Sequence, residues 1–70
     1  MRIAYICCDP GIPVFGTKGA SIHIQGVVRE LRRRGHSVTV HAIRRGEHVP
    51  EDLADLRVVE YPIDEVETTQ

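Results

Sequence analysis

The spacing of hydrophobic residues changes along the chain and predicts strands that alternate with helices. A nearly continuous apolar run covers residues 2–8, which is typical of a strand that is buried on both faces in the middle of a parallel sheet. Residues 20–34 then follow a helical period, and runs rich in β-branched residues at 37–43 and 57–61 predict further strands. Proline and acidic residues at 50–53 predict the first turn of a short helix.

The helix predicted over residues 20–34 has an apolar stripe and recognisable ends. Its stripe consists of Ala20, Ile24, Val27, Val28 and Leu31. Gln25 is expected on the opposite, polar side. Thr17 and Gly19 are the candidates for its N-cap, and Gly35 suits the left-handed position that follows a helix. Gly26 lowers helix propensity by about 1 kcal/mol relative to Ala, and we interpret it as a sign of close packing.

The element order predicts an α/β fold with a three-stranded parallel sheet, in the order strand, helix, strand, short helix, strand. One long helix covers only one face of such a sheet, whereas parallel sheets are usually covered on both. We therefore expect an incomplete Rossmann-like domain over residues 1–63, followed by an acidic tail at 64–70. On its own this unit should be poorly stable, unless it self-associates.

Charge and cysteine content narrow the class of protein. Nine Lys and Arg residues face ten Asp and Glu residues, so bulk charge gives no reason to expect a nucleic-acid partner. Cys7 and Cys8 are adjacent in a predicted strand and point to opposite faces, so a disulfide between them would be strained, and a reducing, cytoplasmic setting is the simplest interpretation. No apolar run approaches the roughly 20 residues that span a bilayer. Peripheral membrane contact through the arginines at 32–34 stays open.

The stretch from Asp9 to Ile24 is the candidate binding site. A loop rich in glycine and proline runs from the first strand directly into the helix, and strand carboxyl ends and helix N-termini are where α/β sheets hold anions. Val14 and Phe15 within this loop are interpreted as anchors that pack into the core, with a hydrophobic lip for a substrate as the alternative.

Several residues of this stretch are candidate ligand contacts. Unpaired backbone N–H groups at the helix start can receive a phosphate or a sugar hydroxyl, and a neighbouring lysine adds a positive charge. The candidates are Gly19, Lys18, Ala20, Ser21, His23 and Asp9. Each also has a structural interpretation: a turn glycine, a solvated lysine, a histidine that supports the helix start, or an aspartate that begins a turn.

Other site chemistries fit the sequence less well. The glycines at 11, 16 and 19 are too widely spaced for the Gly-x-Gly-x-x-Gly motif of dinucleotide-binding oxidoreductases, and Thr17-Lys18-Gly19 runs opposite to a P-loop. His36, His41 and His48 have no metal-ligand spacing with the cysteines, so no metal site is expected.

Three segments in this order resemble the amino terminus of retaining GT-B glycosyltransferases of the family-4 group: Pro13 to Gly19, Ser21 to Ile24, and Arg34 to Val40. The resemblance covers residues 1–45 well and 57–62 loosely. It implies transfer of a sugar from a nucleotide-sugar donor to an acceptor, without a metal or other cofactor. The family's loop usually carries a Gly-Gly pair near the donor phosphates. Here Lys18-Gly19 stands in its place, so only Gly19 carries over.

The same resemblance implies a longer, two-domain enzyme whose other domain holds most of the donor. These 70 residues are therefore expected to form an amino-terminal segment of such an enzyme, without turnover of its own. The alternative is a non-catalytic α/β binding fragment, or a module that interacts with a partner.

Overall fold

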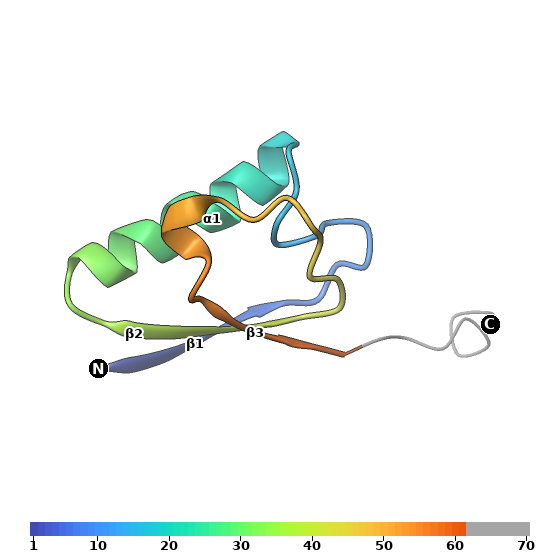
Figure 1. Cartoon of the computed structure of the whole chain (residues 1–70). Helices are drawn as coiled ribbons and strands as arrows, with labels where there is room; N and C mark the ends of the chain where they lie inside the picture. The colour runs from blue at the N-terminus through green and yellow to red at the C-terminus, as the bar shows by residue number, and fades with distance from the viewer. Residues whose placement is uncertain (62–70) are drawn as a thin grey trace.

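A three-stranded parallel sheet with one long helix on one face makes up the chain in a computed structural model, which describes residues 1–61 (Figure 1). The elements in order are β1 (Arg2–Cys7), α1 (Gly19–Arg33), β2 (Ser37–Ala42), η1 (Glu51–Leu53) and β3 (Arg57–Glu60). The predicted α/β class and element order are thus confirmed. The predicted domain end at residue 63 and the acidic tail at 64–70 lie outside the described residues.

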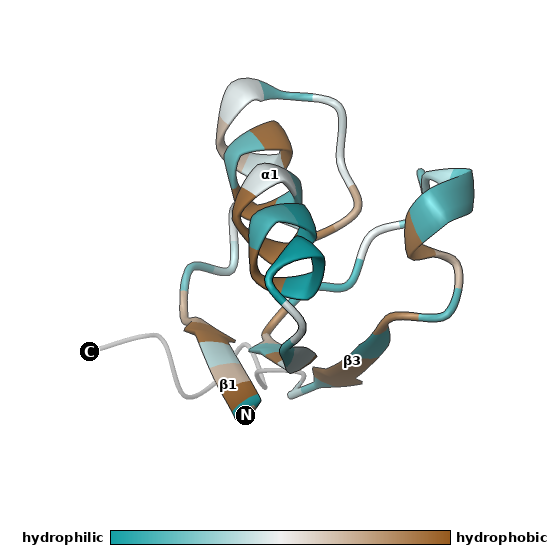
Figure 2. Cartoon of the chain, turned by 90° about the vertical axis from the view of Figure 1, so that its left-hand side faces the viewer, coloured by the Kyte–Doolittle hydropathy of each residue, from teal (hydrophilic) through white to brown (hydrophobic). Residues whose placement is uncertain are grey.

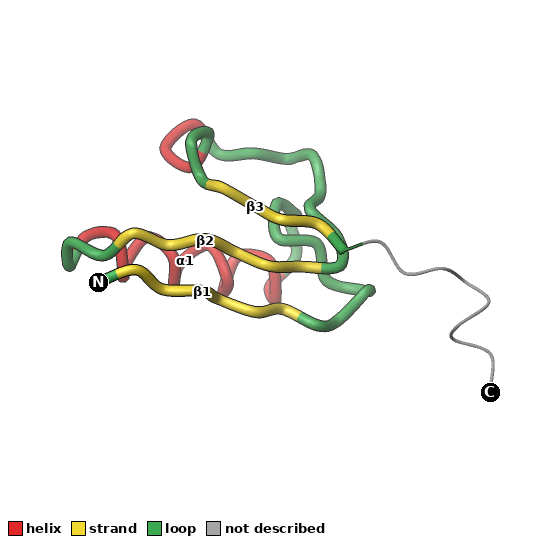
Figure 3. Tube along the Cα trace, turned by 90° about the horizontal axis from the view of Figure 1, so that it is seen from below, coloured by secondary structure: helices red, strands yellow, loops and turns green. Residues whose placement is uncertain are grey.

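The strands lie side by side in the order β1-β2-β3, so β2 is central. β1 pairs with β2 along its whole length, from Arg2 opposite Ser37 to Cys7 opposite Ala42. The prediction that the first strand is buried on both faces in the middle of the sheet is wrong for residues 1–61. Figure 3 views the sheet from the face that α1 does not cover. Alternate residues of β1 are exposed on this face, and Ile6 there is 68% exposed.

The core lies between α1 and the covered face of the sheet. In Figure 2 α1 stands above the strands and η1 lies to its side, over β3. The loop after β1 contributes Val14 and Phe15, both 0% exposed, which confirms that they anchor the loop by packing. The remaining buried hydrophobic residues are Ile24, Val28, Val38, Val40, Ala42, Leu53 and Leu56.

The buried stripe of α1 differs from the predicted one at its N-terminal half. Gln25 is buried, although a polar outer position was expected, and Ala20 is exposed. The reason is that this half faces the polar backbone of the preceding loop as well as the sheet. Gly26 is exposed, and a Cβ there would meet nothing within 4 Å, so its interpretation as a close-packing glycine is wrong.

The ends of α1 are only partly as expected. Lys18 occupies the N-cap position and makes no side-chain cap, so neither Thr17 nor Gly19 caps the helix. At the other end Gly35 has φ 91°, the left-handed conformation predicted for it. None of the helices in residues 1–61 is long and apolar enough to cross a membrane.

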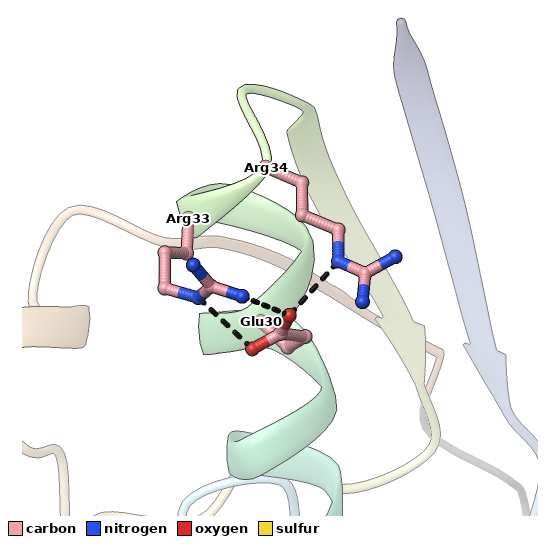
Figure 4. A network of polar contacts seen from close by, with 3 residues as sticks. All are labelled: Glu30, Arg33 and Arg34. Atoms are coloured by element: carbon pink, nitrogen blue, oxygen red, sulfur yellow. Dashed lines mark hydrogen bonds and ion pairs between the residues drawn. The ribbon is translucent and has the colours of Figure 1, made fainter.

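The arginines of α1 form ion pairs on the surface. Arg29 Nε lies 2.7 Å from Asp52 Oδ2, and Arg32 contacts Asp55 at 2.6 Å, so α1 is tied to η1 and the turn after it. Near the helix end Glu30 accepts hydrogen bonds from Arg33 and Arg34 (Figure 4). The hydrogen bonds from Arg33 and then Arg34 lower the pKa of Glu30 to about 2. Exposed pairs of this kind contribute little stability each.

Candidate functional site

The candidate site lies where the loops that follow β1 and β2 run side by side. Phe15 and Gly46 form a parallel bridge between the loops. The Phe15 N–H donates to the Arg45 carbonyl at 2.7 Å, and the Phe15 carbonyl accepts from the His48 N–H at 3.1 Å. These bonds continue the pairing of β1 with β2 beyond the strands. Because the strands are parallel, both loops leave from the same edge of the sheet.

Side chains of α1 hold the first loop in place. The buried amide of Gln25 donates through Nε2 to the Val14 carbonyl at 2.9 Å and to the Gly16 carbonyl at 3.2 Å. Ser21 is also buried, and its Oγ donates to the Pro13 carbonyl at 2.5 Å. Three carbonyl groups that the irregular loop leaves without ladder partners are thereby satisfied. The start of α1 and the loop consequently form one rigid corner.

Two glycines of this corner are required by its geometry. A Cβ on Gly16 would lie 2.5 Å from Ser21 Oγ and 2.9 Å from Pro13 Cγ. Gly46 has φ 83°, and a Cβ there would collide with the Phe15 carbonyl. Gly19 has neither constraint, because its φ is not positive, unlike that of Gly46, and a Cβ there would meet nothing within 4 Å, unlike one on Gly16. Neither backbone conformation nor packing within residues 1–61 calls for glycine at position 19.

A cavity of about 630 Å³ opens between the two loops and the first turn of α1. Its size lies within the usual range of small-molecule sites, about 300–1,000 Å³. Figure 1 shows the two loops and the first turn of α1 together at one end of the molecule. The lining residues come from three segments: Gly11 to Pro13 and Phe15 to Lys18 of the first loop, Ala20 and Ser21 of α1, and Arg44 and Gly46 to His48 of the second loop.

The structure brings only some of the predicted site residues to this cavity. Lys18, Ala20 and Ser21 line it, and Gly19 lies between them at the start of α1 without being a lining residue. His23 is exposed and borders a separate surface depression together with Val27 and Arg34.

Asp9 does not line the cavity either. Its Oδ1 accepts a hydrogen bond from the Gly11 N–H at 2.8 Å, and its carbonyl accepts one from the Ile12 N–H at 3.2 Å. These bonds form a tight turn directly after β1. The geometry of Asp9 is therefore that of a turn-forming aspartate.

The cavity offers positive charge and backbone donors at one end. Lys18 and Arg44 both line it, and neither takes part in an ion pair within residues 1–61. The first N–H groups of an α-helix have no partner inside the helix, and no side chain caps them here. Glu47 adds one negative charge to the lining. This arrangement can hold an anionic group near α1 and a hydroxyl-bearing group near Glu47.

Sequence reasoning missed the second loop. Arg44, Glu47 and His48 line the cavity, but in the sequence they form an unremarkable polar loop. One signal pointed to them: the carboxyl ends of adjacent parallel strands meet at the same edge, so the loop after β2 had to lie beside the loop after β1.

The described part of the chain contains neither a metal-binding cluster nor a disulfide. Residues 1–61 contain no group of three or more His, Cys, Asp or Glu side chains placed to hold a metal ion. Cys7, the last residue of β1, and Cys8, which follows it, are both free.

Comparisons of the chain with models of protein families, with curated proteins and with solved structures found no match.

Proposed function

We propose that the cavity binds the diphosphate and sugar of a nucleotide-sugar, as the first-loop site of the amino-terminal segment of a GT-B glycosyltransferase. The proposal joins the resemblance of residues 1–45 with a cavity in the place where that resemblance puts the donor phosphates. The observation that carries it is Gly19. It is the first residue of α1 and follows Lys18 in the chain. Lys18 and Arg44 have no ion-pair partner within residues 1–61, and the fold of these residues gives no structural reason for a glycine at position 19.

Roles in this proposal fall to the start of α1 and to four lining residues: Lys18, Arg44, Glu47 and His48. The N–H groups of Gly19 and Ala20 donate to phosphate oxygens, and the positive end of the α1 dipole favours the negative charge. Lys18 and Arg44 approach the phosphates from two different loops. Glu47 accepts hydrogen bonds from sugar hydroxyls, and His48 exchanges hydrogen bonds with them. The absence of a Cβ at residue 19 allows the ligand to come close to the backbone.

The test is a titration of the ¹⁵N-labelled chain with a panel of nucleoside diphosphate sugars, followed by NMR. The amide signals of Gly19, Ala20 and Arg44 are expected to shift most. Lys18→Ala and Arg44→Ala should each weaken binding by about tenfold, the effect of one lost charge-assisted hydrogen bond. Arg57→Ala is the matched control, because Arg57 is also exposed and basic but lies on β3 away from the cavity, and it should leave binding unchanged. If all three variants bound the ligand equally more weakly, the loss would follow from the net charge of the chain alone, and this result would contradict the proposal.

A second variant separates a ligand role of Gly19 from a structural one. A Cβ at position 19 would meet nothing within 4 Å, so Gly19→Val should leave the urea unfolding midpoint nearly unchanged while it abolishes the NMR shifts caused by the ligand. Unchanged binding by this variant would show that the glycine is not a ligand contact.

A non-catalytic interaction module is the alternative function, and one observation favours it. The face of the sheet opposite α1 exposes Ile6 and half of Tyr61. An uncovered parallel sheet is unusual, because parallel sheets are normally buried on both faces. An interaction function and a ligand site at the strand ends do not exclude each other, since they use different surfaces.

A further inference from the structure

The outer edge of β1 has no strand beside it within residues 1–61, and its backbone orientation follows from the ladder with β2. The Ser37 N–H donates to the Met1 carbonyl at 3.0 Å, so residue 1 faces β2. Successive residues of a strand point their N–H and C=O groups to opposite sides. Ile3, Tyr5 and Cys7 therefore also face β2, whereas Ala4 and Ile6 present their N–H and C=O groups outward.

The two edges of the sheet differ in how well they resist pairing with another chain. β3 is four residues long, has a charge at each end and is followed closely by Pro62, all of which discourage strand addition. β1 is six residues long, and from Ile3 to Cys8 it contains no charge, no proline and no glycine. By the same criteria the β1 edge is open to a further strand.

A second copy of β1 fits this edge in the antiparallel orientation. A two-fold axis perpendicular to the sheet keeps both α1 helices on the same face, so that residues opposite one another share a face. With the axis at Tyr5, Ala4 lies opposite Ile6 of the other copy, and Ile3 lies opposite Cys7. Both members of the Ala4 and Ile6 pair present their backbone groups outward, so the register forms about four inter-chain backbone hydrogen bonds.

Side chains favour the same register. The small Ala4 side chain stands beside the exposed Ile6 of the other copy, and the two Tyr5 rings meet as a cross-strand aromatic pair. Moving the axis to Ala4 would place the Arg2 guanidinium beside Ile6. The net charge of -1 for each chain opposes association only weakly.

We propose that the chain forms a homodimer by antiparallel pairing of its β1 edges, centred on Tyr5, which joins two three-stranded sheets into one of six strands. Six strands is within the common size range of sheets, about 4–6. The contact is smaller than a standard protein interface, so the dimer dissociates on dilution.

Light scattering combined with size-exclusion chromatography of the full chain, over a wide concentration range, measures the monomer–dimer equilibrium. Ala4→Pro removes one outward N–H and leaves every β1–β2 hydrogen bond in place, because the N–H of Ala4 does not face β2. This variant should raise the dissociation constant by about tenfold or more. Ala4→Ser is the matched control, since it keeps both the N–H and a small side chain, and it should dimerise like the native chain.

Amide hydrogen exchange of the native chain tests the register without a variant, which matters if Ala4→Pro does not fold. At dimer concentrations the amides of Ala4 and Ile6 should exchange slowly, and on dilution they should become fast. The amides of Ile3 and Tyr5 should stay slow throughout, because they face β2. The proposal is overturned by a chain that is monomeric at all concentrations, by a dimer in which the Ala4 and Ile6 amides exchange fast, or by a folded Ala4→Pro variant that dimerises like the native chain.

Discussion

Replacing Gln25 by methionine tests whether α1 holds the candidate site in shape. The substitution preserves the length of the side chain and removes the hydrogen bonds to the Val14 and Gly16 carbonyls, at 2.9 and 3.2 Å. A buried acceptor without a partner costs about 1–3 kcal/mol. With two acceptors affected, and some access of water to the loop, we expect a loss of about 2–4 kcal/mol in the free energy of unfolding.

This loss is large for so short a chain. At 0.05–0.15 kcal/mol per residue a domain of this length has a total stability of roughly 3.5–10 kcal/mol. Urea unfolding followed by far-UV circular dichroism measures the change, and with a slope of about 1 kcal/mol per molar the midpoint should fall by about 2 M or more. His23→Ala is the control on the same helix, because His23 is exposed, and it should change stability by about 0.5 kcal/mol at most.

The result that would refute this reasoning is a Gln25→Met variant that unfolds within about 0.5 kcal/mol of the native chain. The loop would then be held by the packing of Val14 and Phe15, the backbone bonds to the second loop and the Ser21 hydrogen bond, without a contribution from Gln25. Hydrogen exchange adds a local measurement, since the Phe15 amide is bonded to the Arg45 carbonyl and should lose protection only if the loop loosens.

Two further predictions concern glycines and pH. Gly46→Ala should destabilise the chain by about 1–3 kcal/mol, because Gly46 has a positive φ and an added Cβ would collide with the Phe15 carbonyl. Gly26→Ala should instead stabilise α1 by about 0.5–1 kcal/mol, because the added Cβ meets nothing within 4 Å. Urea unfolding of both variants measures the two changes, and equal changes would contradict this prediction. The pKa of Glu30 is lowered in the folded chain, so its ion pairs stabilise the fold at pH values above the ordinary glutamate pKa of about 4.3, and this contribution is lost as the pH falls toward about 2. An NMR titration of the Glu30 carboxyl measures this pKa, which should rise in Arg33→Ala. A Glu30 that titrates at the ordinary glutamate pKa in the native chain would disprove the coupling to the arginines.

Much of the fold could be read from local patterns. The helical period of α1, the β-branched composition of β2 and β3 and the glycine after α1 are properties of short segments, and each matches the structure. The parallel arrangement followed as well, because short strand–helix–strand connections allow little else. For the candidate site, the same local reasoning found the start of α1 and Lys18, which are adjacent in the chain.

What depends on distant segments was decided only by the tertiary structure. Hydrophobicity placed residues 2–8 in a strand, but whether β1 is central or at an edge depends on which strands lie beside it. Gln25 looks like a surface residue until the loop at 13–16 folds against it. Arg44 and Glu47 reach the cavity only because the parallel sheet sends both loops to the same edge. A periodic pattern reports which side of a segment is covered, whereas the partner that covers it comes from elsewhere in the chain.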